Sequence, residues 1–143
     1  GQTAVAITDH GCMYGVVEFY KAAKKRGIQP ILGCEVYVAR STRFDKVHEL
    51  DGENRHLVLL CENETGYHNL LALVSKAWVE GFYSKPRVDL DLLREHHEGL
   101  IALSACLAGE VARNIQKGLV DEAKKAALKY QECFGKGNFF LER

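Results

Sequence analysis

Short, mainly apolar runs alternate along this chain with stretches whose apolar residues recur at helical spacing, and this alternation constrains the fold most strongly. Runs of this length, bounded by glycine and polar residues, are typical of β-strands. The runs cover residues 3–8, 30–39, 56–61, 99–104 and 138–142. Strands alternating with helices predict an α/β fold with a largely parallel sheet or barrel.

The segments between these runs are predicted to be helical. In residues 14–26, Val16 and Ala23 belong to an apolar stripe, and Gly27 supplies the end. A second helix is expected from a cap at Thr65 to a stop at Gly81. Shorter helices are expected at residues 90–97, 108–117 and 119–134. The strand at 30–39 is apolar on both faces and is predicted to be covered on both sides, whereas residues 40–54 are predicted to form a polar surface excursion.

Composition limits the functional classes that need to be considered. The chain has 143 residues, 47% of them hydrophobic, which suits the core of one domain and excludes intrinsic disorder. Its 19 Lys and Arg residues balance 19 Asp and Glu, which excludes a strongly basic, free-standing nucleic-acid binder. No apolar run approaches the ~18 residues that span a bilayer, so no membrane partner is expected. Five cysteines without regular spacing indicate a reducing, cytoplasmic location.

Four side chains are candidate metal ligands because of where they lie relative to the predicted strands. His10 follows the first strand and Cys106 follows the fourth, at the strand ends where function gathers in α/β folds. Glu35 lies inside an otherwise apolar strand, where a carboxylate is costly unless it is paired or binds metal. His56 opens the third strand. Imidazole, carboxylate and thiolate are all ligands for a divalent metal such as zinc.

Each candidate also has a simpler interpretation. Asp9 and Gly11 suit an ordinary turn, and His56 lies at the start of its strand rather than at the end where ligands gather. Cys106 alone fits a small buried residue, and Glu35 alone fits a structural salt bridge with Lys or Arg. The other cysteines are interpreted as small buried residues and the other histidines as solvated: Cys12, Cys34, Cys61, Cys133, His48, His68, His96 and His97.

Four blocks of sequence run through the chain in a recognisable order. They read AITDHGCMYGVVEFYKAAKKRGIQPILGCEVYVA, RHLVLLCENETGYHNLLALVSKAWVEGFYSKPRVD, GLIALSACLAGEV and GNFFLER. Together they resemble the PHP (polymerase and histidinol phosphatase) domain of bacterial DNA polymerase III alpha subunits. The resemblance extends from Thr3 to Arg143 and implies a distorted barrel of seven strands and helices that holds up to three divalent metal ions.

The resemblance also implies roles for individual residues. By it, His10 binds one metal ion, Glu35 bridges two, and His56 and Cys106 hold another ion together with Glu35. Asp9 then orients His10 from behind. Zinc, manganese or iron are the expected metals. A metal-activated water is the expected nucleophile, and no catalytic side chain is assigned.

The sequence departs from the family pattern at both ends. The family's opening His-x-His block and closing Asp-x-His block are absent here, and the sequence begins at Gly1 rather than at methionine. We therefore expect residues 1–143 to be the interior portion of a PHP domain, a partial, distorted (β/α)7 barrel lacking its first and last strands. Such a chain should hold fewer than three metal ions or none, and hydrolyse little. Lys85 and Arg87 are the best basic candidates for a phosphate or DNA-backbone contact, and a solvated loop is the alternative.

The function implied by the resemblance is DNA replication. In the intact parent, a separate domain performs DNA-directed nucleotidyl transfer, and the PHP domain is either a metal-dependent 3′–5′ proofreading exonuclease or a platform. The expected partners are primer–template DNA and the other subunits of the replicative holoenzyme. Two alternatives stay open: a free-standing metal-dependent phosphoesterase of the histidinol-phosphatase type, and a non-catalytic scaffold.

Overall fold

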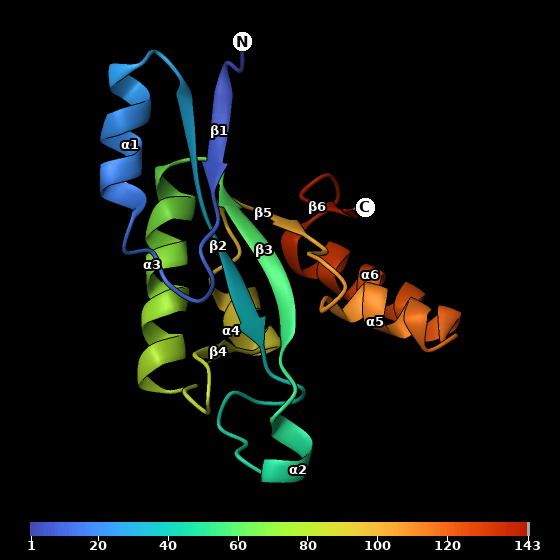
Figure 1. The fold of residues 1–143 in the computed structure, drawn as a ribbon. Helices are drawn as coiled ribbons and strands as arrows, with labels where there is room; N and C mark the ends of the chain where they lie inside the picture. Colours follow the sequence, from blue (N-terminus) through green and yellow to red (C-terminus); the bar gives the residue numbers. More distant parts are fainter. Residues whose placement is uncertain (143) are drawn as a thin grey trace.

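The computed structural model describes residues 1–142, which form six strands and six helices that alternate except for the consecutive helices α5 and α6 (Figure 1). The predicted mixed α/β alternation is confirmed. In chain order the elements are β1 (Ala4–Ile7), α1 (Val16–Lys25), β2 (Gln29–Val38), α2 (His48–Asp51), β3 (Arg55–Cys61), α3 (Glu64–Val79), β4 (Arg87–Val88), α4 (Leu90–Glu95), β5 (Leu100–Leu103), α5 (Glu110–Gln116), α6 (Val120–Phe134) and β6 (Phe139–Phe140). Among residues 1–142, no helix combines the length and the apolar character needed to cross a membrane.

The strands form one mixed sheet in the order β1-β2-β3-β5-β6, with β4 also paired to β2. Strands β1 and β4 run parallel to β2, and β6 runs parallel to β5, whereas β3 is antiparallel to both of its neighbours. The prediction of a largely parallel sheet is therefore wrong for the central strands. The connection at residues 39–54 holds only the four-residue helix α2, which lies at the end of β2 and β3 rather than across a sheet face, so the chain returns antiparallel (Figure 1). The seven-stranded barrel stays a prediction.

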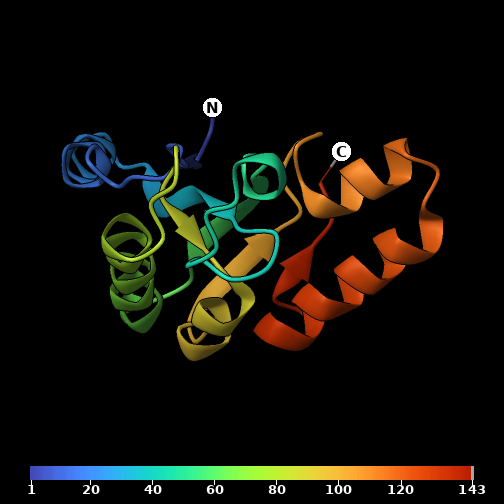
Figure 2. The ribbon, with the colours of Figure 1, turned by 90° about the horizontal axis from the view of Figure 1, so that it is seen from below.

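Helices cover one face of this sheet. Along β2, Cys34, Val36 and Val38 alternate with Glu35 and Tyr37, and the first set points into the main core. Figure 2 shows α3 and α4 along one side of the sheet and α6 beside β6. The other strands and the helices fill this core with large apolar residues: Leu57, Leu59, Leu70, Leu73, Leu92, Leu93, Leu100, Tyr130 and Phe134.

The opposite face of the sheet borders a cavity of about 670 Å³. Glu35, Val58 and Leu103 line it from the strands, and Cys106 and Ala112 line it from the β5–α5 connection and α5. The prediction that β2 is covered by apolar packing on both sides is therefore wrong. The period of two along β2 places its one carboxylate on the cavity side, away from the helix-covered core.

Several local features differ from the sequence predictions, among them helix α2 and the two-residue strand β4, which the sequence does not predict. The cap of α3 is Asn63, whose side-chain oxygen accepts a hydrogen bond from Gly66 N–H at 3.0 Å, so this helix begins before the predicted cap Thr65. The polar excursion at residues 40–54 is also less exposed than predicted, because Asp51 is buried. One Asp51 oxygen accepts Val47 N–H at 2.9 Å, and the other lies 3.5 Å from Arg40 Nε.

Candidate metal centre

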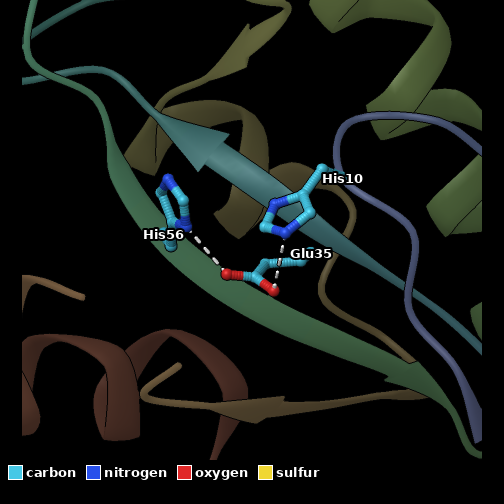
Figure 3. A group of neighbouring side chains, drawn as sticks. All are labelled: His10, Glu35 and His56. Carbon is cyan, nitrogen blue, oxygen red and sulfur yellow. Dashed lines mark hydrogen bonds and ion pairs between the residues drawn. The ribbon is translucent and has the colours of Figure 1, made fainter. Parts of the chain in front are cut away.

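Three of the predicted ligands, His10, Glu35 and His56, converge beside strand β2 (Figure 3). His56 Nδ1 lies 2.7 Å from Glu35 Oε1, and His10 Nε2 lies 3.7 Å from Glu35 Oε2. Each residue offers one ligand atom, and the three atoms lie within 4.8 Å of one another. Two imidazole nitrogens and a carboxylate so close together are a donor set that fits a divalent metal ion. The alternative of a Glu35 salt bridge to Lys or Arg is wrong within residues 1–142, where its ion-pair partners are the two histidines.

Strand pairing explains this convergence. His10 continues the parallel pairing of β1 with β2 and forms a bridge with Glu35, where Gly11 N–H donates to Glu35 O at 3.0 Å. His56 pairs with Tyr37, two residues from Glu35 and on the same face of the sheet. His56 is the second residue of β3, near the start of the strand, which is the wrong end for a ligand in a parallel sheet. Because β3 is antiparallel to β2, however, its start lies beside the carboxyl end of β2.

Cys106 lies at the rim of the same cluster. Its Sγ is 4.0 Å from both Glu35 Oε1 and His56 Nδ1. The side chain is exposed, so the interpretation of Cys106 as a small buried residue is wrong. Its loop folds back onto β3, where His56 N–H donates to Ala108 O at 3.1 Å. Ala105, just before the thiol, has a φ of 60°, a left-handed conformation that alanine rarely adopts, so the backbone that presents Cys106 is held in a strained form.

Tyr37 links the two histidines to Lys85. Its ring stacks on His10, with centroids 6.1 Å apart, and meets His56 edge-on at 5.1 Å. The exposed Lys85 places its Nζ 5.6 Å from the centroid of the same ring. Burial and the Glu35 charge raise the pKa of Tyr37, so its phenol stays protonated near neutral pH. Sequence reasoning missed Tyr37, although the two-residue period of β2 places it on the Glu35 face.

Arg87 has a different role from the one predicted. It is fully buried, and its guanidinium donates to three backbone carbonyl oxygens: Gly81 O at 2.9 Å, Arg43 O at 2.9 Å and Asp45 O at 2.8 Å. The prediction that Arg87 contacts phosphate or DNA is therefore wrong. Its neighbour Lys85 is exposed and stays a candidate for that contact.

Asp9 contributes to the cluster through its backbone. Its carbonyl oxygen accepts Glu35 N–H at 3.0 Å and the Cys34 thiol at 3.2 Å. Burial raises the pKa of Cys34 to about 12, so this thiol stays protonated and able to donate. Among residues 1–142, no hydrogen bond joins the Asp9 carboxylate to His10. The orienting role of the Asp9 side chain stays a prediction.

The remaining cysteines and histidines lie outside the cluster defined by His10, Glu35 and His56. Cys34 and Cys133 are buried as predicted, whereas Cys12 and Cys61 are only half-buried. Burial raises the pKa of Cys61 and Cys133 to about 11. One histidine prediction is wrong: His96 is half-buried, with Nδ1 3.3 Å from Asn69 Oδ1, rather than solvated. The other predicted solvated histidines are exposed: His48, His68 and His97.

A second polar cluster joins the start of α5 to the strand that carries His56. The Glu110 carboxylate accepts Lys129 Nζ at 2.8 Å on each oxygen and Tyr130 Oη at 2.9 Å, and it lies 3.9 Å from Arg55 Nε. Burial alone would raise the pKa of Glu110, but the hydrogen bond and charge of Lys129, together with Arg55 and Tyr130, hold the pKa below its ordinary value. This cluster holds α5 against β3. It thereby also fixes the end of the Cys106 loop, residues 104–109 between β5 and α5.

The lowered pKa of Glu110 predicts an acid-sensitive contribution to folding. The unfolded chain binds a proton at Glu110 more readily than the folded chain, so the stabilisation is fully present above about pH 4.3 and is lost as pH falls through the lower folded value. We expect the free energy of unfolding, measured by urea titration from pH 3 to 7, to fall with acid less steeply in Glu110→Gln than in the wild type. Glu53→Gln, which removes an exposed partner of Arg113, is the control and should keep the wild-type slope. Parallel profiles for wild type and Glu110→Gln would contradict this prediction.

Comparison with known proteins assigns this chain to a family. The model of the PHP domain matches residues 1–143. The chain is 50% identical over 143 residues to the DNA polymerase III subunit alpha of Treponema pallidum, covering 99% of this chain and 12% of that protein. It is 51% identical over 140 residues to the same subunit of Chlamydia trachomatis, covering 97% and 11%, and 48% identical over 141 residues to that of Thermus aquaticus, covering 97% and 12%. The chain thus spans about an eighth of the length of these curated relatives.

Proposed function

The chain belongs to the PHP domain family, and on this premise we propose that it is part of a metal-binding PHP domain within a DNA polymerase III alpha subunit. The relatives reported above carry that name at 48–51% identity over nearly the whole chain. DNA-directed nucleotidyl transfer would then reside elsewhere in such a subunit. Primer–template DNA and the other holoenzyme subunits would be its partners in the cytoplasm.

The observation that carries this proposal is the Glu35 carboxylate, whose two oxygens face different imidazoles. We propose His10, Glu35, His56 and Cys106 as ligands for zinc, manganese or iron, with up to three ions in a complete domain. The separate orientation of the two Glu35 oxygens supports a bridging role. The exposed thiol of Cys106, 4.0 Å from both Glu35 and His56, supports its place in the ligand set.

The proposed reaction is hydrolysis of the terminal phosphodiester at a DNA 3′ end. Divalent ions at such a site supply a Lewis acid and lower the pKa of a bound water. Water adds to phosphorus, the 3′ oxygen of the preceding nucleotide leaves and takes up a proton, and a nucleoside 5′-monophosphate is released. The Lys85 ammonium lies over the Tyr37 ring, which itself contacts both histidines. A positive charge in this position suits attraction of the phosphate.

The test measures metal-dependent release of 3′-terminal nucleotides by the alpha subunit that contains this chain. We expect release from a mismatched primer end that stops on chelation and resumes with added zinc, manganese or iron. Turnover of histidinol phosphate with no release from DNA would instead favour a phosphoesterase activity of the histidinol-phosphatase type. Bound metal without turnover of either substrate would favour a scaffold. Both outcomes contradict the proofreading role.

Substitution of Cys106 tests the ligand set separately. Thiolate is a soft ligand that favours zinc, whereas a hydroxyl does not, so Cys106→Ser should weaken zinc affinity at least about tenfold and affect manganese much less. Isothermal titration with each metal measures both affinities. Cys61→Ser, at the far end of β3, is the matched control and should change neither. An unaltered zinc-to-manganese preference in Cys106→Ser would remove Cys106 from the proposed ligands.

A further inference from the structure

The indole of Trp78 is hydrogen-bonded to the backbone of the His10 loop, residues 8–15 between β1 and α1. Its Nε1–H donates to Gly11 O at 2.8 Å, across 67 positions of sequence. Trp78 lies near the end of α3, is 43% exposed, and stacks on Phe82 with ring centroids 5.5 Å apart. Because Trp78 is half-exposed, its ring contributes little to the core. Its single N–H donor bonds the carbonyl of the residue that follows the candidate ligand His10, so core packing alone does not explain its position.

Gly11 is held from three directions. Its amide donates to Glu35 O of β2 at 3.0 Å, and its carbonyl accepts the Trp78 indole of α3. Its φ is +65°, and a Cβ atom there would lie 2.9 Å from Pro86 and 3.0 Å from Tyr37. These contacts fix the backbone on the carboxyl side of His10 in one conformation.

The His10 side chain has few restraints of its own. It is 55% exposed, its nearest ion-pair atom is Glu35 Oε2 at 3.7 Å, and its ring contacts are Tyr37 and His56. The direction of its ring toward Glu35 therefore depends largely on where the backbone holds its Cα. Groups that orient a metal ligand from outside typically change metal affinity by 10–100-fold when they are removed.

We infer that Trp78 is a positioning residue for the metal centre, holding the His10 loop in register with Glu35 through its indole N–H. The effect of Trp78 on metal affinity rests on the proposed metal-binding function, whereas the hydrogen bond from Trp78 to Gly11 does not. Helix α3 also packs on β2, β3, β4 and β5, so its position relative to the sheet is fixed. The indole hydrogen bond therefore fixes the position of His10 relative to the same sheet.

The first test needs no metal. Trp78→Phe keeps an aromatic ring and removes the donor, so the Gly11 amide should exchange hydrogen at least about tenfold faster, with no change at the Glu62 amide, which donates to Gly99 O at 2.9 Å in a loop contact elsewhere. Phe82→Leu removes the stacking partner but leaves the indole N–H, and should leave Gly11 exchange within twofold of the wild type. Unchanged Gly11 exchange in Trp78→Phe, or an equal rise in Phe82→Leu or at Glu62, would overturn the inference.

The second test uses zinc alone, measured by isothermal titration. Trp78→Phe should bind zinc about tenfold more weakly than both the wild type and Phe82→Leu. Faster Gly11 exchange with unchanged zinc affinity would overturn the positioning role. Absence of zinc binding to the wild type would contradict the proposed function, while the exchange measurement would still decide whether Trp78 holds the loop.

A third measurement needs no substitution and covers the case in which Trp78→Phe fails to fold. The chain contains one tryptophan, so its single indole N–H resonance can be followed directly in the wild type. We expect zinc binding to shift this resonance, because the ligand loop and the indole share a hydrogen bond. An indole signal that stays unchanged at zinc saturation would overturn the inference.

Discussion

Glu35→Gln is expected to abolish metal binding, lowering affinity for zinc, manganese or iron more than about a hundredfold, since even partners behind the ligands typically contribute 10–100-fold. Glutamine keeps the shape of the side chain and its ability to hydrogen-bond His56, but it removes the negative charge that faces both histidines. Metal content after dialysis and isothermal titration measure the loss. Retention of wild-type metal content would contradict the assignment of Glu35 as the central ligand.

The same substitution should affect thermal stability in a metal-dependent way. A ligand at a hundred times its Kd stabilises a folded protein by about 2.7 kcal/mol, so saturating metal should raise the Tm of the wild type and leave that of Glu35→Gln unchanged. Without metal, the two proteins should unfold at similar temperatures, because the substitution removes a poorly exposed charge that is costly to bury and leaves a side chain that still hydrogen-bonds His56. Glu62→Gln, an exposed carboxylate just after β3, is the control and should retain the metal-induced rise.

Arg87→Met is expected to destabilise the fold by about 3–5 kcal/mol, because each buried acceptor left without a donor costs about 1–3 kcal/mol. The substitution leaves the carbonyl oxygens of Gly81, Arg43 and Asp45 without the guanidinium that now bonds them. Arg87→Lys should recover little of this loss, because an ammonium lacks the planar fork that reaches three carbonyls at once. Urea unfolding followed by circular dichroism measures the change.

Lys85→Met separates the structural and functional roles of this basic pair. Lys85 is exposed, so the substitution should change the free energy of unfolding by no more than about 0.5 kcal/mol. In the alpha subunit, however, it should raise the KM for a DNA 3′ end if Lys85 attracts the phosphate. Equal destabilisation by Lys85→Met and Arg87→Met would contradict the structural role assigned to Arg87.

The sequence predicts the order and type of the longer elements, but it misses the short elements α2 and β4 and the direction of the central strands. Apolar periodicity and glycine stops depend on local chemistry, which is why the helix ends near Gly27, Gly118 and Gly135 agree with the structure. The antiparallel placement of β3 depends on where residues 39–54 pack, and the polar composition of that segment does not encode it. The burial of Asp51 also depends on how this segment packs, because its ion-pair partner Arg40 comes within reach only in the folded chain.

For the site, chemistry selected His10, Glu35 and His56, and the structure brings these three together. Spacing alone could not show that His56 lies beside Glu35, because that contact requires the antiparallel pairing of β2 with β3. Lys85 and Arg87 could not be distinguished from sequence either. They lie two positions apart with the same charge, and only the fold separates them: Arg87 is buried within β4, whereas Lys85 lies in the exposed connection before it.

The strand pairing at Glu35 also determines where this chain can gain or lose residues during evolution. An insertion at the exposed residues 48–50 would lengthen the excursion and leave Tyr37 opposite His56. An insertion of one residue between Ile7 and His10 would shift the pairing with β2 by one position and turn the imidazole to the other side of the sheet. We therefore expect length variation to be tolerated in the first segment and excluded in the second, even though both lie between strands of the sheet.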